Sequence, residues 1–398
     1  MRRELIATAT FGLEAVVRRE IQSLGYEVVR TEDGKVTYLA DERGIVRSNL
    51  WLRCADRVLL KVAEFDAPDF ETLFQRTGGI PWEEIIPADG RFTVLCTTVK
   101  SALHNEPACQ RTVKKAIALR LQEFYVRESM PETGAAYTVK LTLLRDRATL
   151  TIDTSGAGLH KRGYRVTSVA APMKETLAAA LVQLSFWKPG RLLIDPCCGS
   201  GTIPIEAAMI GANIAPGLSR GFASEEWEII GEDIWKEERR EAFAAIRQDA
   251  SLEICASDVD PRALEAAREN AEEAGVGDII RLKQISLADR VKTGDFRQEG
   301  TVVVTNPPYG ERIGEKKTIA GIYASFRLAM EVNPGLSLFA ITADKGIEEA
   351  LGRKADRRRK LFNGNIEATY YQFHGQRLGR KSVDMAGSGP VADRRQDG

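Results

Sequence analysis

The sequence predicts an α/β protein whose C-terminal part forms a mostly parallel, doubly wound sheet behind two smaller α+β units. From about residue 171 to residue 375, helical and strand-like segments alternate, which is typical of parallel strands joined by crossover helices. Residues 4–65 give the order strand, helix, strand, strand, helix, strand, which is the split βαβ pattern of a ferredoxin-like domain.

Length and composition limit the class of protein. A chain of 398 residues with 43% hydrophobic and 28% charged residues is typical of two or three globular domains. No apolar run approaches the ~20 residues of a membrane helix, and the N-terminus does not resemble a signal peptide. The six cysteines form no C-x-x-C pair and the three histidines are scattered. We therefore expect a reduced, cytoplasmic protein without a metal site.

The first unit is expected to cover residues 1–66. A strand-like run over 4–9 leads into a helix from Phe11 to Leu24, and Gly25 can close that helix in the left-handed conformation. The remaining elements follow in order: strands near 26–30 and 35–39, a helix over 43–53 and a strand over 57–65.

The second unit is expected over residues 67–165. Its elements are a helix at 70–76, a strand at 91–98, a helix at 106–121, and a hairpin of strands 138–144 and 147–153 that turns at Arg145-Asp146. Three basic residues share one face of the longer helix, which is most typical of a solvated surface: Arg111, Lys114 and Lys115. The connector 158–165 holds two glycines, His160, Tyr164 and three basic residues: Lys161, Arg162 and Arg165. It could bind phosphates and stack on a base, or serve as a charged linker.

The third unit is expected over residues 166–376. A helix at 173–186 and a strand at 191–194 lead to Asp195-Pro196-Cys197-Cys198-Gly199-Ser200-Gly201-Thr202 and a second helix. Glycines after a strand let the backbone approach a ligand, and the helix N-terminus favours a carboxylate. Because the pattern is neither a P-loop nor a full G-x-G-x-x-G, a ligand with an amino-acid end is favoured over a dinucleotide.

The next strand, near 252–256, ends in Ser257-Asp258. Asp258 is placed to accept hydrogen bonds from a ribose diol, whereas Asp260 and Pro261 have the pattern of a helix cap and first helical residue. Together with the glycine turn, this predicts S-adenosylmethionine as the cofactor and S-adenosylhomocysteine as its product. Ser286, after the third strand, is a candidate for the adenine amine, and Asp289 is a weaker one.

Asn306-Pro307-Pro308-Tyr309 follows the strand-like run 301–305 and has the chemistry of a target-base loop. The Asn306 carbonyl and a proline carbonyl can accept the hydrogens of an exocyclic amine, which draws its nitrogen toward a nucleophilic geometry. Proline has no N–H to compete, and Tyr309 offers a stacking face. Asn-Pro-Pro is also an ordinary turn sequence.

Two other features have simpler interpretations. Cys197 and Cys198 could be nucleophiles, but no histidine lies in either motif, so small residues in a tight loop are the better interpretation. The six basic residues between 353 and 360 could contact phosphates, yet they favour a solvated helix end before the strand-like run 368–373. Residues 377–398 are polar with little to bury, so we expect a disordered tail.

Over about residues 1–375 the sequence resembles the bacterial THUMP-domain RNA methyltransferases, often labelled adenine-specific DNA methylases. Within that group it is most similar to the portion that forms guanine N2-methyl groups in large-subunit ribosomal RNA. The motifs that carry the resemblance lie at 158–165, 172–176, 195–202, 213–220 with Trp227, and 306–309.

The resemblance implies an N-terminal ferredoxin-like subdomain, a THUMP domain that binds RNA, and a seven-stranded class I methyltransferase domain. It implies that Asn306, Pro307, Pro308 and Tyr309 receive the target base. The residues expected at the cofactor are Asp195, Pro196, Cys197, Gly199, Gly201, Thr202, Ser257, Asp258, Ser286 and Thr176. The sequence departs from the family at Ser286 and in lacking a strongly basic N-terminal half.

The leading hypothesis is an RNA methyltransferase that acts on an exocyclic base amine, with guanine N2 of ribosomal RNA as the favoured target. An adenine-N6 DNA methyltransferase is the alternative, since the same loop serves that base. A non-catalytic RNA-binding or ribosome assembly factor is a third hypothesis, which the intact Asn306 loop and glycine turn disfavour.

Overall fold

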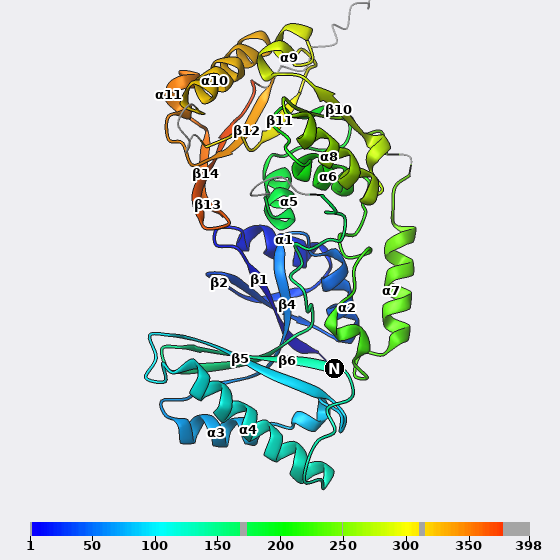
Figure 1. The fold of residues 1–398 in the computed structure, drawn as a ribbon, viewed down its shortest axis with the longest axis vertical. Coiled ribbons are helices and arrows are strands. Elements are labelled where there is room, and N and C mark those ends of the chain that lie inside the picture. Colours follow the sequence, from blue (N-terminus) through cyan, green and yellow to red (C-terminus); the bar gives the residue numbers. More distant parts are fainter. Residues whose placement is uncertain (1, 168–172, 249, 310–314, 377–398) are drawn as a thin grey trace, which may run out of the picture.

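The computed structural model describes residues 2–167, 173–248, 250–309 and 315–376. Two seven-stranded sheets form the molecule, one from the N-terminal half and one from the C-terminal half. The N-terminal units and the C-terminal unit lie one above the other along the long axis (Figure 1). Within the described residues, no helix is long and apolar enough to cross a membrane. The predicted tail at 377–398 lies outside the described residues.

The first half of the N-terminal sheet has the predicted ferredoxin-like order. Its elements are β1 (Arg3–Ala9), α1 (Glu14–Ser23), β2 (Glu27–Glu32), β3 (Lys35–Ala40), α2 (Glu42–Trp51) and β4 (Ala55–Asp66). The strands lie in the order β2-β3-β1-β4, and β1 is antiparallel to both of its neighbours. Gly25 has φ +88 directly after α1, which confirms it as the residue that ends this helix.

The second half of this sheet is built by the next unit. Its elements are α3 (Phe70–Gly78), η1 (Trp82–Glu84), β5 (Arg91–Val99), α4 (Glu106–Tyr125), β6 (Ala136–Leu144) and β7 (Arg147–Asp153). β7 pairs with β4, so both N-terminal units share one continuous sheet. Arg145 and Asp146 both have positive φ, at 52° and 62°, as the predicted two-residue hairpin requires. The boundary predicted between residues 66 and 67 falls where β4 ends and remains a proposal.

The C-terminal sheet has the order β10-β9-β8-β11-β12-β14-β13. Its strands are β8 (Leu193–Asp195), β9 (Ile254–Asp258), β10 (Ile280–Gln284), β11 (Val302–Thr305), β12 (Ser337–Thr342), β13 (Arg357–Asn363) and β14 (Ile366–Phe373). The first five in spatial order are parallel, and β14 and β13 are antiparallel additions. Strand order reverses between β8 and β11, so a crevice is expected at their carboxyl ends.

Helices and short 3₁₀ turns connect these strands. They are α5 (Glu175–Leu184), α6 (Thr202–Gly211), η2 (Ala223–Glu226), α7 (Glu232–Ala244), α8 (Pro261–Glu273), η3 (Gly277–Ile279), α9 (Leu287–Thr293), α10 (Glu315–Val332) and α11 (Ile347–Leu351). Nine of the ten residues of α5 are buried, because this helix contacts both α1 and α6. α5 therefore joins the core of the C-terminal unit to the ferredoxin-like unit.

The prediction of a solvated helix end at residues 353–360 is wrong. Arg357–Asn363 forms β13, which pairs along its whole length with β14. A charged run can form a strand here because β13 lies at the sheet edge, where charged side chains also discourage further strand pairing. Its exposed cations have partners at the surface, including Arg358 with Glu348 and Lys360 with Glu367.

The segment between α6 and α7 bridges the two halves. Gly217 N–H donates to the Leu50 carbonyl of α2 at 3.0 Å. Further along, Arg43 and Arg47 of α2 pair with Glu238 of α7 at 2.8 and 2.9 Å, although Glu238 is almost fully buried. Figure 1 shows α7 running alongside the ferredoxin-like unit, away from the rest of the C-terminal domain.

Replacing Gly217 with alanine should loosen this bridge. A Cβ there would lie 2.8 Å from Leu50 Cα and 2.9 Å from the Asn49 carbonyl oxygen, both backbone atoms. Overpacking of this kind costs about 1–3 kcal/mol, which urea unfolding would measure. Gly221→Ala is the matched control, because its Cβ would meet nothing within 4 Å. Equal stability of the two variants would contradict the docking of this segment on α2.

Candidate active site

The glycine turn after β8 is shaped by two left-handed residues. Gly199 has φ +52 and Gly201 has φ +83, and a Cβ on Gly201 would lie 3.0 Å from Ala267 Cβ in α8. The turn therefore needs glycine both for its conformation and for close packing against α8. α6 begins directly afterwards at Thr202, so its N-terminal N–H groups face the same region.

Asp258, at the end of β9, holds this turn in place. Its Oδ2 accepts the Gly199 N–H at 2.9 Å, and its Oδ1 accepts the Asp260 N–H at 3.0 Å. Each carboxylate oxygen can accept a second hydrogen bond, so both retain capacity for a diol. Asp260 caps α8 by accepting the Arg262 N–H at 2.9 Å, as predicted.

Asp195 is the buried acid of the site. Its Oδ1 accepts a hydrogen bond from Thr305 Oγ1 at 2.8 Å and another from the Cys197 N–H at 3.2 Å. Burial raises the pKa of this carboxyl group to about 7, and those two hydrogen bonds offset the effect only in part. A cationic ligand group beside Asp195 would favour its ionised form.

Asn306 follows β11, and its side-chain carbonyl oxygen accepts no hydrogen bond from the described residues. This Oδ1 atom is buried. Buried polar atoms are rarely left without a partner, so an orphaned acceptor in a cavity indicates a place for a donor group. Three residues later, Tyr309 Oη accepts a hydrogen bond from Asn363 Nδ2 of β13 at 3.1 Å.

A cavity of about 560 Å³ joins these strand ends. Nine predicted site residues line it: Asp195, Pro196, Cys197, Gly199, Thr202, Asp258, Ser286, Asn306 and Pro308. Five others lie outside the lining: Gly201, Ser257, Thr176, Pro307 and Tyr309. The lining brings together residues that are more than 100 positions apart in the chain. The functional roles of these residues remain proposals.

The sequence analysis missed one wall of this cavity. α10 contributes Thr318, Gly321, Ile322 and Ser325, and Met173 and Ile203 lie on other sides. The α10 residues have the i, i+3, i+4, i+7 spacing of one helix face. That signal was present in the sequence, yet it also fits a face packed against the sheet.

Three predicted residues have structural partners of their own. Ser286 caps α9: its hydroxyl accepts the Asp289 N–H at 3.1 Å and donates to the Asp289 carboxylate at 2.7 Å. Ser257 is buried and accepts a hydrogen bond from Arg290 Nη1. Thr176 donates to Asp56 of the ferredoxin-like unit at 3.4 Å, which places it between the domains. Of these three residues, Ser286 therefore already donates its only hydroxyl hydrogen, to the Asp289 carboxylate.

The two adjacent cysteines behave as small loop residues. Burial raises the pKa of the Cys197 thiol and of the Cys198 thiol well above the usual value, and the nearby Asp195 carboxylate adds to both shifts. Thiolates are the reactive form of cysteine. A nucleophilic role is therefore disfavoured.

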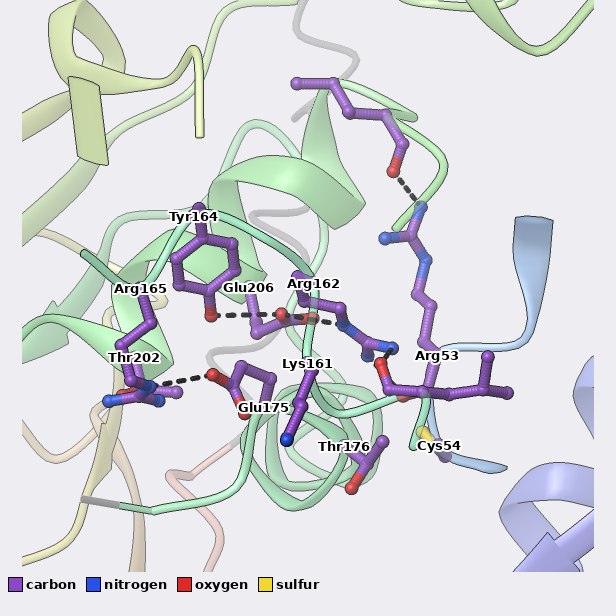
Figure 2. Close-up of polar contacts among 12 residues, drawn as sticks. Arg53, Cys54, Lys161, Arg162, Tyr164, Arg165, Glu175, Thr176, Thr202 and Glu206 are labelled. Carbon is purple, nitrogen blue, oxygen red and sulfur yellow. Dashed lines mark hydrogen bonds and ion pairs between the residues drawn. The ribbon is translucent and has the colours of Figure 1, made fainter. Parts of the chain in front are cut away.

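The connector at 158–165 is not a free linker, and its Arg162 and Tyr164 are not exposed to bind phosphate or stack on a base. Arg162 is buried, with Nε 3.3 Å from Glu206 Oε1, and it also donates to the carbonyls of Leu159 and Arg53. Tyr164 is buried as well and donates to the same Glu206 oxygen at 3.1 Å. Figure 2 shows both side chains converging on Glu206 of α6. Sequence alone could not distinguish a buried arginine from an exposed one.

Arg165 carries the connector to the glycine turn. Its guanidinium donates to Glu175 Oε1 at 2.8 Å, the Met173 carbonyl at 2.9 Å, Thr202 Oγ1 at 3.1 Å and Ser200 Oγ at 3.3 Å. Met173, Ser200 and Thr202 all line the cavity. One side chain thus fixes three parts of the cavity wall.

The chain matches three protein families. Residues 4–59 match the RlmL ferredoxin-like domain, residues 67–153 match the THUMP domain, and residues 162–372 match the RMKL-like methyltransferase domain.

Two relatives extend this similarity to most of the chain. The Bacillus subtilis protein named “Putative RNA methyltransferase YpsC” is 50% identical over 385 residues, covering 96% of this chain and 99% of that protein. The “Ribosomal RNA large subunit methyltransferase K/L” of Syntrophotalea carbinolica is 35% identical over 387 residues, covering 93% of this chain and 53% of that protein.

Two solved structures share the complete fold. One, from Listeria monocytogenes, is named a “predicted N6-adenine-specific DNA methylase”; it is 45% identical, with a TM-score of 0.89 over 94% of this chain and 97% of that one. The other, SMU.472, is named a “putative methyltransferase complexed with SAH”; it is 42% identical, with a TM-score of 0.89 over 95% and 99% of the two chains.

Binding of S-adenosylhomocysteine should depend on pH through Asp195. The ionised carboxylate is the form that pairs with an ammonium group, and its pKa is about 7. Below that pH the ionised fraction falls, so the affinity should weaken by up to about tenfold per pH unit. Calorimetric titration across this range would measure it. The Asp195→Asn variant should bind S-adenosylhomocysteine weakly at every pH. An unchanged pH profile in this variant would show that Asp195 does not bind the ammonium group of the ligand.

Arg165→Ala should weaken S-adenosylhomocysteine binding by roughly tenfold, about 1.4 kcal/mol, because the cavity wall loses its common donor. Arg165→Lys should recover only part of the affinity, since an ammonium group cannot reproduce the planar fork. Calorimetry gives the affinities, and thermal unfolding checks the fold. Arg268→Ala is the control, because Arg268 forms an exposed ion pair with Glu265. Unchanged affinity in Arg165→Ala would exclude this role.

Proposed function

Since the chain belongs to the RlmL-like family of THUMP-domain, S-adenosylmethionine-dependent RNA methyltransferases, we propose that its target is guanine N2 in large-subunit ribosomal RNA. The observation that carries the proposal of an exocyclic amine as methyl acceptor is the buried Asn306 Oδ1 in the cavity wall, to which none of the described residues donates a hydrogen bond. An exocyclic amine is the kind of donor this acceptor lacks. The ribosomal target is supported by the resemblance and by the named activity of the K/L relative.

The residues of the cavity fit the cofactor. Asp195 is suited to the ammonium group, the N-terminus of α6 to the carboxylate, and Asp258 to the ribose diol. When bound, S-adenosylmethionine supplies an electrophilic methyl group. The chain's own contribution is to orient the target amine against it, which is worth several orders of magnitude in rate.

The Asn306 loop polarises and positions the amine. Asn306 Oδ1 accepts one amine hydrogen, and a proline carbonyl of the loop accepts the second, because the loop carries no proline N–H to compete. Tyr309 presents its ring with the hydroxyl held by Asn363. Guanine N2 and adenine N6 are both amines of this kind, so the loop alone permits either base.

Adenine N6 of DNA is the second candidate, supported by the name of the Listeria monocytogenes relative. The N-terminal half disfavours it, since it matches the RlmL ferredoxin-like domain and the THUMP domain, and a THUMP domain implies RNA binding. An assembly factor without catalysis is disfavoured by the orphaned Asn306 acceptor.

Asn306→Ala should abolish methyl transfer, with a loss on the order of 10²–10³-fold or more in kcat, as for removal of one preorganised catalytic group. Binding of S-adenosylhomocysteine should stay nearly unchanged, because Asn306 contacts the amine and not the donor. Transfer of labelled methyl and calorimetry give the two quantities. If Asn306→Ala lost donor binding instead, this division of roles would be wrong.

Transfer of labelled methyl from S-adenosylmethionine to two substrates tests the function itself. One substrate is ribosomal RNA from cells that lack this protein, offered naked and as ribosomal particles, and the other is unmethylated genomic DNA. Label recovered as N2-methylguanosine supports the proposal. Label recovered as N6-methyladenine in DNA overturns it in favour of the second candidate.

A further inference from the structure

Beside the Asn306 loop, the two halves of the chain meet at an aromatic pair. Phe11 precedes α1 and packs edge-on against Phe362 of β13, with ring centroids 6.4 Å apart and an interplanar angle of 72°. Phe11 nevertheless keeps 49% of its surface exposed. In Figure 1 the β13–β14 hairpin extends to the N-terminal elements at this point. About half of the Phe11 surface is therefore available to a ligand.

Backbone contacts hold Phe11 in position. Gly12 has φ +89, and a Cβ there would lie 2.8 Å from the Lys360 carbonyl oxygen, so glycine permits this close approach. Arg359 Nη1 also donates to the Gly12 carbonyl at 2.8 Å. A ring presented by a fixed backbone loses little conformational entropy when a ligand stacks on it.

The aromatic pair is linked to the target-base loop. Asn363 is adjacent to Phe362 in β13 and donates to Tyr309 Oη at 3.1 Å. Tyr309 is three residues from Asn306, so their Cα atoms lie within about 11 Å, given at most ~3.6 Å per residue. β13 thus joins the Asn306 loop to the aromatic pair, and an RNA strand bound at Asn306 can extend along β13 to Phe362.

The charge around the pair matches a nucleic acid. Lys360 Nζ lies 5.7 Å from the Phe362 ring centroid and pairs with Glu367 at 2.7 Å. Both partners are more than half exposed, at 54% and 61%, and exposed pairs of this kind contribute little to stability. Lys360 can therefore exchange Glu367 for a phosphate. Arg357 and Arg359 of the same strand add further positive charge, whereas Arg358 is paired with Glu348.

We propose that Phe11 and Phe362 form a stacking platform for an unpaired nucleotide of the RNA strand that carries the target base, with Lys360 at its phosphate. The inference rests on the proposed function, since it places RNA at the Asn306 loop. Unpaired RNA bases commonly stack on aromatic side chains. Phe11 belongs to the ferredoxin-like unit and Phe362 to the catalytic unit, so the platform gives the N-terminal half a direct part in placing the target.

Three variants test the platform: Phe11→Leu, Phe11→Tyr and the control Phe243→Leu. Leucine keeps apolar packing and removes the aromatic face, tyrosine keeps the face, and Phe243 is an exposed phenylalanine on α7. With ribosomal RNA as substrate, Phe11→Leu should lower kcat/KM by roughly 5- to 100-fold, the effect of losing one stacked base. Phe11→Tyr and Phe243→Leu should match the wild type, and affinity for S-adenosylhomocysteine should not change.

The outcomes separate this inference from the function on which it rests. Equal kcat/KM for Phe11→Leu and Phe243→Leu overturns the platform, because packing alone then explains Phe11. A changed oligomeric state of Phe11→Leu in sedimentation, with unchanged RNA affinity, overturns it in favour of an interface between copies of the chain. If the wild type methylates no RNA, the proposed function fails. Fluorescence anisotropy with a short single-stranded RNA of mixed sequence then tests the platform: several-fold weaker binding by Phe11→Leu supports it, and equal binding overturns it.

Discussion

The structure depends most on one buried carboxylate, Glu206. It is completely buried and accepts hydrogen bonds from Arg162 and Tyr164 through the same oxygen, Oε1. An unpaired charge at such a depth costs several kcal/mol, so Glu206 and Arg162 can be buried only together. Glu206 lies in α6, which begins at the glycine turn. The interaction therefore attaches the connector from the N-terminal half to the helix that begins at the glycine turn (Figure 2).

The two halves also meet at two further places, on either side of this contact. At the first, α7 and the segment around Gly217 form hydrogen bonds and ion pairs with α2. At the second, Phe362 of the β13–β14 hairpin packs against Phe11. With α5 buried between the two cores, the RNA-binding and catalytic units are fixed to each other at several points. These contacts hold the two halves of the chain in one arrangement in the structure.

Most of the fold followed from local pattern. The ferredoxin-like strand order, the Arg145-Asp146 hairpin, the Asp260 cap and the doubly wound sheet were predicted and are confirmed, because each depends on periodicity or on turn residues. β13 was missed because its pairing with β14 overrides a charged sequence that has no strand-like alternation. The α10 wall was missed because a helix face toward a cavity has the same spacing as one toward a core.

The sequence by itself determined the chemistry of the strand ends. Asp195 and Asp258 end β8 and β9, the two glycines lie in the turn after β8, and Asn306 follows β11. The carboxyl ends of parallel strands meet at one edge of the sheet. Only the tertiary structure decided what the arginines do. Arg162 is buried against the Glu206 carboxylate, 44 positions later in the chain. Arg165 instead donates hydrogen bonds to Ser200 and Thr202. The physical reason is that a guanidinium group suits phosphate, solvent or a buried carboxylate equally well, and only the folded chain determines which one it meets.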